Sequence, residues 1–435
     1  MIAGMKQARH THPQRTQRLS QPRDSFAQWQ RTQRENVIRW IADNNAFYQA
    51  HWKGARQDAK EGSEIDFESL PLTTKSDLVG SDPSGHCRNL SFAADQYLRF
   101  HRTSGTTGQP MVVLDTADDW QFWMEGWQFV LDVADLNESD SVLMAFSFGP
   151  FVGFWSAFDA VVERGALVIP TGSLSTEARL DLIETSKPTT LFCTPSYALH
   201  LAEYANQKNI DLANSSVNKI VVAGEPGGSL AEIRQRIESA FAAKVFDHAG
   251  ATEIGPWGFA DAEGTGLFVN ESLFYPEFLD PETNQCLDPD TSQTEGQVCQ
   301  LALTTLGRLG CPVVRYLTGD LVRPTWKKES PFVFLEGGVL SRADDMMIIR
   351  GVNVFPSSIE AILRGIEGVD EFRIEVYRQG EMDQLRIIAE DHQNDPNRIA
   401  QQIQLRLGLR VEVELAEPGS LPRFEMKGQR FVDKR

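Results

Sequence analysis

Short apolar runs alternate with amphipathic stretches in the middle of the chain. The runs are rich in β-branched and aromatic side chains and cover residues 142–146, 166–169, 189–193 and 219–223. Residues 175–185 and 229–241, which lie between or after these runs, carry apolar side chains at helical spacing. Strands that are apolar throughout are typical of sheets with both faces covered. The pattern therefore predicts an α/β architecture.

The most apolar long stretch, residues 144–162, is interrupted by Gly149, Pro150, Gly153 and Asp159. A membrane-spanning helix needs about 20 consecutive, predominantly apolar residues. We therefore expect a strand, a loop and a buried helix in this stretch, and no membrane partner.

The pattern changes after about residue 344. We expect a helix at 357–364, strands at 371–377 and 383–389, a helix that begins near Asp395-Pro396, and a strand at 410–415. The first two strands flank Arg378-Gln379-Gly380-Glu381 as a hairpin. This ββαβ unit predicts a small C-terminal α+β domain, residues 344–435, joined by a hinge to a large N-terminal domain, residues 35–341.

The first 34 residues are basic, with seven Lys or Arg and only Asp24 as an acid. An organellar transit peptide has such a composition, but Gln, His and Pro interrupt any apolar face here. We expect residues 1–34 to be a disordered basic tail. Order is expected to begin near Glu35, where Val37, Ile38 and Ile41 recur at helical spacing.

Composition narrows the class of protein further. The chain has 435 residues, 41% of them hydrophobic, and 60 acidic against 42 basic side chains give a net charge of −18. This is the composition of a globular protein, and its acidity argues against binding to nucleic acid or to an anionic membrane. The five cysteines form no CxxC pair. We expect a reduced, cytoplasmic protein.

One loop has the composition of a phosphate-binding segment. Ser104-Gly105-Thr106-Thr107-Gly108 combines two glycines, which expose backbone amides, with three hydroxyl groups. It does not match the GxxxxGK[ST] pattern of Walker-type loops. Taken alone, the pentapeptide is equally typical of an ordinary turn.

Two acidic residues are candidates for contacts with a nucleotide. Glu253 follows Thr252 in a glycine-containing turn. A carboxylate beside a phosphate loop is a suitable ligand for Mg²⁺. A Glu that caps a helix explains this position equally well. Asp320 follows Tyr316-Leu317-Thr318-Gly319 on a predicted tight turn, where it would accept bonds from ribose hydroxyls. An Asp satisfied by its own turn is the structural alternative.

Seven motifs occur in a specific order along the chain. They are Leu72-Thr73-Thr74-Lys75, residues 102–110 around Ser104, Cys193-Thr194-Pro195-Ser196-Tyr197-Ala198, Ala223-Gly224-Glu225-Pro226, residues 316–320, residues 341–356 (SRADDMMIIRGVNVFP) and Lys427. With these motifs, residues 35–435 resemble the adenylate-forming acyl- and aryl-CoA ligases, and among them the phenylacetate–CoA ligase family. The resemblance implies that the large domain is the AMP-binding domain and that the small one is mobile.

The resemblance also implies a role for each motif residue. The ATP phosphates would be covered by Ser104, Gly105, Thr106, Thr107 and Gly108 and touched by Thr252, while Glu253 would hold Mg²⁺. The adenine would be framed by Gly224, Glu225, Pro226, Asp247, His248 and Ala249, and the ribose would be bound by Asp320, with Arg342 beside it. Asp344 would be the hinge, and Lys427 would reach the carboxylate and the α-phosphate.

The chemistry of carboxylate activation fits these roles. Attack of a carboxylate on a phosphate brings two anions together, so a metal ion and a Lys must neutralise the charge. By position alone, Lys427 is a solvated residue near a chain end, and only the residues that flank it indicate more. The chain departs from the family pattern at Gln109, usually Lys, and at Ala249, commonly Tyr. Residues 321–338 contain no cysteine, so we expect no structural zinc.

An aromatic run marks a possible acid-binding pocket. Phe148, Phe151 and Phe154 crowd together after a strand, near the family's aryl pocket, and Trp257 lies just beyond Glu253. Such a run is more often plain core, but part of it would suit a flat apolar slot.

Together these observations predict an enzyme, an acid–thiol ligase that uses ATP, Mg²⁺ and coenzyme A. It would convert a hydrophobic carboxylic acid, with an aromatic acid favoured, to an acyl-adenylate and then to an acyl-CoA, releasing AMP and pyrophosphate. One alternative is transfer to the phosphopantetheine of a carrier protein or to another acceptor. Another is a noncatalytic nucleotide- or acyl-binding relative, because fold does not guarantee function. A homodimer is compatible with the sequence.

Overall fold

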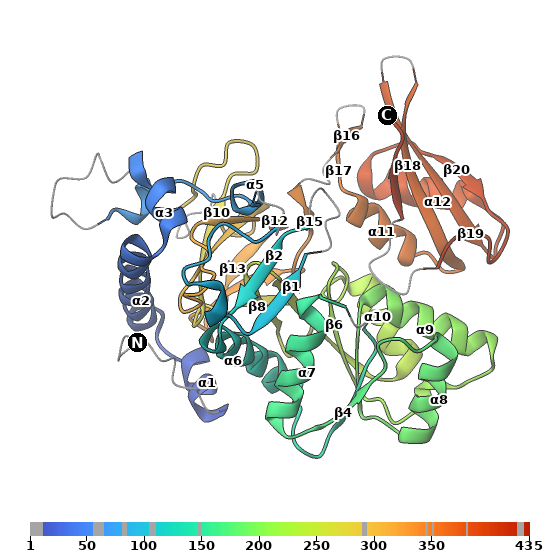
Figure 1. Ribbon diagram of the computed structural model, residues 1–435. Coiled ribbons are helices and arrows are strands. Elements are labelled where there is room, and N and C mark those ends of the chain that lie inside the picture. The colour runs from blue at the N-terminus through green and yellow to red at the C-terminus, as the bar shows by residue number, and fades with distance from the viewer. Residues whose placement is uncertain are drawn as a thin grey trace.

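A computed structural model describes residues 12–54, 65–80, 85–103, 110–146, 149–288, 294–343, 347–349, 352–379, 382–423 and 430–435. Figure 1 shows a large N-terminal domain and a smaller C-terminal domain, which is coloured orange to red and lies against the helices α9 (Pro195–Gln207) and α10 (Ala231–Phe241). The two-domain α/β fold predicted from the sequence is confirmed.

The centre of the large domain is a nine-stranded sheet with the order β13-β14-β9-β8-β7-β6-β5-β3-β4. Its strands are β13 (Pro324–Trp326), β14 (Val333–Glu336), β9 (Gly266–Val269), β8 (Gly255–Ala260), β7 (Lys244–Ala251), β6 (Lys219–Ala223), β5 (Thr190–Cys193), β3 (Ser141–Met144) and β4 (Leu167–Pro170). Strands β4, β3, β5, β6 and β7 pair in parallel, and the remaining pairs are antiparallel. The four apolar runs predicted as strands correspond to β3, β4, β5 and β6.

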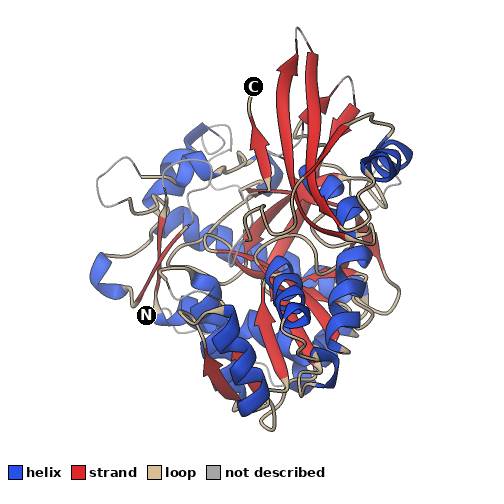
Figure 2. Cartoon of the chain, turned by 90° about the vertical axis from the view of Figure 1, so that its right-hand side faces the viewer, coloured by secondary structure: helices blue, strands red, loops and turns tan. Residues whose placement is uncertain are grey.

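Both faces of the parallel strands are covered, because successive side chains point to opposite sides. Phe192 and Val221 pack with α6 (Ala117–Val133) and α7 (Val152–Arg164) on one face. Leu191 and Val222 pack with α8 (Thr176–Ser186), α9 and α10 on the other. Helices on either side of the strands are visible in Figure 2.

Two further strand groups complete the N-terminal domain. The strands β10 (Phe274–Leu279), β11 (Cys299–Thr305), β12 (Tyr316–Val322) and β15 (Ser341–Arg342) form an antiparallel sheet in that order. The strands β1 (Arg99–Arg102) and β2 (Val112–Asp115) form an antiparallel pair. The predicted phosphate-binding residues lie between β1 and β2 in the sequence.

The C-terminal domain has its own sheet, with the order β20-β19-β18-β21. Its strands are β20 (Glu412–Leu415), β19 (Met382–Asp391), β18 (Val369–Gln379) and β21 (Phe431–Asp433); α11 (Pro356–Arg364), α12 (Pro396–Leu407) and the short pair β16 (Met347–Ile349) and β17 (Val352–Val354) complete the domain. As predicted, Asp395 caps α12 by accepting bonds from two backbone amides. The ββαβ prediction is confirmed, and the parallel pairing of β21 with β18 adds a strand that it missed.

The prediction of a disordered tail is wrong for residues 12–34. They form α1 (His12–Leu19) and the first half of α2 (Arg23–Asn44), which is followed by α3 (Ala46–His51). Arg15 is buried and pairs with Asp132 at 2.6 Å, and Phe26 joins the core. Gln30 donates hydrogen bonds to Glu271. This segment is thus held by partners far away in the sequence, such as Asp132 and Glu271, which composition cannot reveal.

All five cysteines lie in the described part of the chain and are free thiols. Among the described helices, none combines the length and the apolar character that a membrane crossing requires.

Candidate active site

The strands β5, β6 and β7 end at one edge of the central sheet, because they run in parallel. The segments that follow them begin at Thr194, Gly224 and Thr252. Ligands of open α/β sheets bind outside the carboxyl ends of such strands. This edge therefore gathers three motifs that are far apart in the sequence.

The Glu253 carboxylate is held by groups from two other parts of the domain. Tyr316, on β12, donates a hydrogen bond to Glu253 Oε1 at 3.0 Å. Lys75, the first residue of the short helix α5 (Lys75–Leu78), lies 3.9 Å from the same oxygen. Burial, followed by the nearby Glu253 charge, raises the pKa of Tyr316 well above its ordinary value, so the phenol stays a donor. The side chain of Glu253 is 12% exposed.

A buried ion pair fixes the backbone of this turn. Arg308 and Asp115 are fully buried, with Arg308 Nη2 2.6 Å from Asp115 Oδ1. Arg308 Nη1 donates to the carbonyl oxygens of Thr252, at 3.2 Å, and Glu253, at 2.9 Å. Burial disfavours both charges, yet Arg308 lowers the pKa of Asp115 and Asp115 raises that of Arg308. Since Asp115 ends β2, the pair links the β1–β2 hairpin to the Glu253 turn.

Asp320 and Arg342 face each other across β12 and β15. Arg342 Nη1 donates to Asp320 Oδ1 at 2.8 Å and to the carbonyl oxygen of Thr318 at 2.6 Å. Gly319, which lies between Thr318 and Asp320 in the sequence, has φ +78°, and a Cβ there would lie 2.5 Å from Arg342 Nη2. The glycine thus permits both the approach of the guanidinium group and an irregular backbone at this point. The predicted tight turn before Asp320 is wrong, because Gly319 and Asp320 lie within the continuous strand β12.

Asp247 and His248 are buried in the middle of β7. Asp247 accepts a hydrogen bond from Ser229 Oγ at 2.6 Å, and His248 Nδ1 lies 2.7 Å from the carbonyl oxygen of Gly258. Burial raises the pKa of Asp247 to about 6 and lowers that of His248 to about 4. The imidazole is therefore neutral and packs on Trp127, 4.2 Å between ring centroids. Ala249 is only half buried.

The Gly224-Glu225-Pro226 segment follows β6. Gly224 has φ +94° and is exposed. Glu225 Oε1 accepts a hydrogen bond from the backbone amide of Ser196 at 2.7 Å, in the first turn of α9. The carboxylate thus stabilises the helix N-terminus that the Cys193–Ala198 motif begins.

Comparisons with known proteins show to which family the chain belongs. The AMP-binding enzyme model matches residues 26–297, and the AMP-binding enzyme C-terminal domain model matches residues 351–435. The chain belongs to the AMP-binding enzyme family. It is 32% identical to phenylacetate-coenzyme A ligase of Pseudomonas putida, over 85% of each chain, and 31% identical to that of Escherichia coli K12, over 92% of each. The predicted family and the predicted activity, an AMP-forming acid–CoA ligase, are confirmed.

Solved structures agree with this membership. A 2-hydroxyisobutyryl-CoA ligase in the postadenylation state, in complex with R3-HIB-AMP, matches with a TM-score of 0.88 and 26% identity, over 100% of this chain and 94% of that one. The same ligase in the thioesterification state, in complex with 2-HIB-AMP and CoA, matches with a TM-score of 0.70 over 96% and 91%.

Several predicted site residues of this family member lie outside the described residues. They are Ser104, Gly105, Thr106, Thr107, Gly108, Phe148, Asp344 and Lys427. Their roles stay predictions. Within the described residues, no group of three His, Cys, Asp or Glu side chains is arranged to hold a metal ion.

The aromatic residues predicted for the acid pocket are mostly core residues. Phe154 is 2% exposed and packs beside Trp155 and Phe158. Trp257 is also 2% exposed and belongs to a different hydrophobic cluster. Phe151 is half buried at the start of α7. The plain-core alternative therefore describes Phe154 and Trp257.

Sequence reasoning missed two charged residues near Glu253. Lys75 belongs to a motif that carried the family resemblance, but nothing local indicated a contact across 178 residues with Glu253. Arg308 had no such signal, because an isolated Arg in a loop is ordinarily a solvated residue. Its burial depends on Asp115, which only the folded chain brings close.

Proposed function

We propose that this ligase activates an aromatic carboxylic acid of the phenylacetate type. The observation that carries the proposal is the 30–32% identity to four phenylacetate-coenzyme A ligases over 85–93% of this chain. Identity of this extent over nearly the whole length of both partners supports a shared substrate class as well as a shared fold.

The Glu253 turn is the proposed site of the ATP phosphates. Ser104, Gly105, Thr106, Thr107 and Gly108 would cover the phosphates, and Thr252 would contact them. Glu253 would hold Mg²⁺, which suits one or two carboxylates together with phosphate oxygens. Its carboxylate is already oriented by Tyr316 and its backbone by Arg308, which supports this role. The metal, when bound, supplies positive charge where the two anions approach.

The nucleoside would lie along the same edge. Asp320, oriented by Arg342, has the acceptor oxygens that ribose hydroxyls need. Gly224, Glu225 and Pro226 would frame the adenine, together with Asp247, His248 and Ala249. Since Asp247 and His248 are buried and bonded within the core, we assign them a supporting position behind Ala249.

The C-terminal domain would contribute Lys427 to the first half-reaction, and Asp344 would be the hinge for a second orientation. The better match to the postadenylation state of 2-hydroxyisobutyryl-CoA ligase than to its thioesterification state supports an adenylation-type orientation here. Both states belong to one ligase, so their different TM-scores reflect its conformation. We also propose that the protein is cytoplasmic, that its partners are small molecules and that it forms a homodimer.

A short branched hydroxy acid is the second candidate substrate. It rests on the structural match to 2-hydroxyisobutyryl-CoA ligase, at 26% identity. The higher identity to the phenylacetate ligases favours the aromatic acid.

Pyrophosphate release in the presence of ATP and Mg²⁺ tests these proposals. The acids to compare are phenylacetate, benzoate and 2-hydroxyisobutyrate, each with and without coenzyme A. We expect the highest kcat/KM with phenylacetate and stoichiometric loss of the free thiol. Preference for 2-hydroxyisobutyrate would replace the aromatic assignment. Pyrophosphate release without thiol consumption would favour a carrier protein as acceptor, and no release with any acid would favour a noncatalytic relative.

A further inference from the structure

The two domains meet through charged side chains. Arg236 on α10 donates to the carbonyl oxygen of Arg364, at the end of α11, at 2.7 Å. Arg406 on α12 pairs with Glu232 on α10 at 3.2 Å. The apolar core of the C-terminal domain is separate from the cluster that contains α9 and α10. Among the described residues, polar contacts and not a shared apolar core therefore hold the two domains in this orientation.

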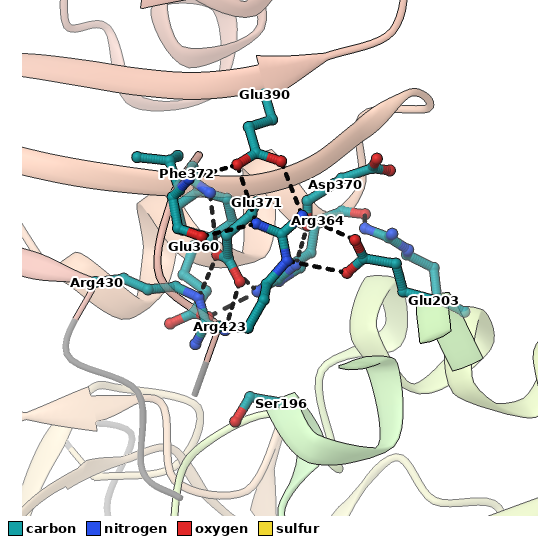
Figure 3. Close-up of polar contacts among 12 residues, drawn as sticks. Ser196, Glu203, Glu360, Arg364, Asp370, Glu371, Phe372, Glu390, Arg423 and Arg430 are labelled. Atoms are coloured by element: carbon teal, nitrogen blue, oxygen red, sulfur yellow. Dashed lines mark hydrogen bonds and ion pairs between the residues drawn. The ribbon is translucent and has the colours of Figure 1, made fainter. Parts of the chain in front are cut away.

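Arg423 makes the best-defined of these contacts. Its Nη2 lies 2.8 Å from Glu203 Oε1 on α9, and its Nε lies 3.3 Å from Glu203 Oε2. The same guanidinium group binds Glu390 of its own domain through Nη1, at 3.0 Å, and Nη2, at 2.8 Å. Figure 3 shows Arg423 between these two carboxylates.

The C-terminal half of this contact is rigid. Glu390, 2% exposed, also accepts hydrogen bonds from the backbone amides of Gly419 and Leu421. It thus fixes the segment that carries Arg423, and it would keep the Arg423 charge paired if the domain moved. Only Glu203, 23% exposed, would lose its Arg423 partner; it would keep the hydrogen bond from Gln207 and regain water. Separation of such a half-buried pair costs less than separation of a fully buried one, since water compensates the charge that it exposes.

We propose that Glu203 and Arg423 form a releasable latch pair that positions the C-terminal domain for acyl-adenylate formation. The pair would break when the domain turns for thioester formation. An apolar contact of the same extent would resist that rotation, because exposing it to water costs free energy in proportion to its area. Arg423 precedes Lys427 by four residues, so the latch also fixes where the segment bearing this proposed catalytic Lys begins. The inference rests on the proposed two half-reactions.

The test changes Glu203, which leaves the Arg423–Glu390 contact intact. Glu203→Gln removes the charge, and Glu203→Arg adds repulsion. The matched control is Glu177→Gln, because Glu177 pairs with Lys208 at 3.6 Å within the N-terminal domain. Domain orientation is followed by fluorescence energy transfer between dyes at Leu167→Cys and Leu405→Cys, which are exposed positions in different domains, with the exposed Cys286 changed to Ser.

We expect Glu203→Arg to shift the energy-transfer distribution and to slow acyl-adenylate formation about 5- to 10-fold, with Glu203→Gln about 2- to 3-fold. Thioester formation from supplied phenylacetyl-adenylate and coenzyme A should stay at the wild-type rate. An unshifted distribution, or equal losses in both half-reactions, would overturn the latch. If the wild type activates none of the acids, the proposed function fails, while energy transfer still decides whether Glu203 sets the orientation.

Discussion

Two arginine–carboxylate contacts of similar length differ in how far they are buried. Arg308 and Asp115 are 2.6 Å apart and wholly buried within the N-terminal domain. Arg423 and Glu203 are 2.8 Å apart, join two domains and are 20% and 23% exposed. The first contact holds the backbone of the Glu253 turn. The second holds the orientation of a domain.

Burial decides what each contact does. Loss of one partner from a fully buried pair leaves an uncompensated charge and costs about 3–5 kcal/mol, and this cost falls with exposure to about 0–1 kcal/mol for pairs at the surface. An arginine–carboxylate contact can therefore fix a turn permanently when it is buried, and hold a domain releasably when water reaches it. A ligase with two half-reactions needs both, because its nucleotide site must stay assembled while the smaller domain turns.

The largest effect is expected from Arg308→Gln. It leaves Asp115 buried without its cation, so the free energy of unfolding should fall by about 3–5 kcal/mol. Denaturant-induced unfolding measures this value. Glu203→Gln is the comparison variant for the half-buried contact, because it leaves Arg423 paired with Glu390, and a loss of about 1 kcal/mol is expected. Equal losses in the two variants would remove the contrast between buried and exposed pairs.

The next effect concerns function and not stability. Glu253→Gln should reduce acyl-adenylate formation by about 10²–10³-fold, because one group that stabilises developing charge is lost from the site. The free energy of unfolding should stay within about 0.5 kcal/mol, since the amide oxygen still accepts from Tyr316. The matched control is the exposed Glu336→Gln. Pyrophosphate release within about threefold of wild type would contradict the Mg²⁺ assignment.

A smaller, pH-dependent effect is expected from Glu271, the buried acid that binds Gln30 of α2. Burial raises its pKa to about 7 from an ordinary 4.5. Because the folded state binds this proton more tightly, the stability contribution is complete below about pH 4.5 and is lost as pH rises through about 7. In Glu271→Gln, the fall in the free energy of unfolding with rising pH should be smaller by about 2–3 kcal/mol.

Denaturant unfolding at pH 4.5, 6 and 8 measures the decline, with the exposed Glu263→Gln as the control. A decline as steep in Glu271→Gln as in the wild type would contradict this explanation.

The sequence predicted most of the fold because periodicity reports burial. Residues 219–223 are apolar on both faces, and they are a central parallel strand. Asp395-Pro396 carries a local capping signal, and the helix begins there. Residues 12–34 were mispredicted because their order depends on remote partners such as Asp132 and Glu271.

The candidate site was predictable only where a motif carried it. The family motifs indicated Glu253, Asp320 and Arg342, and the structure brings Asp320 and Arg342 into contact. Arg308 and Glu203 act through contacts with residues far away in the sequence, and no periodicity or local signal marks such residues. Charged residues that fix a backbone or a domain are therefore the part that sequence reasoning misses.

The most direct test of the two-orientation account is Lys427→Ala. The Lys427 ammonium group would offset repulsion between carboxylate and phosphate in the first half-reaction, and the turning domain would carry it away before the second. The measurement compares formation of phenylacetyl-adenylate from ATP and phenylacetate with formation of the thioester from supplied phenylacetyl-adenylate and coenzyme A. We expect a loss of about 10²–10³-fold in the first rate and a near-wild-type second rate. Equal losses in both rates would contradict the account.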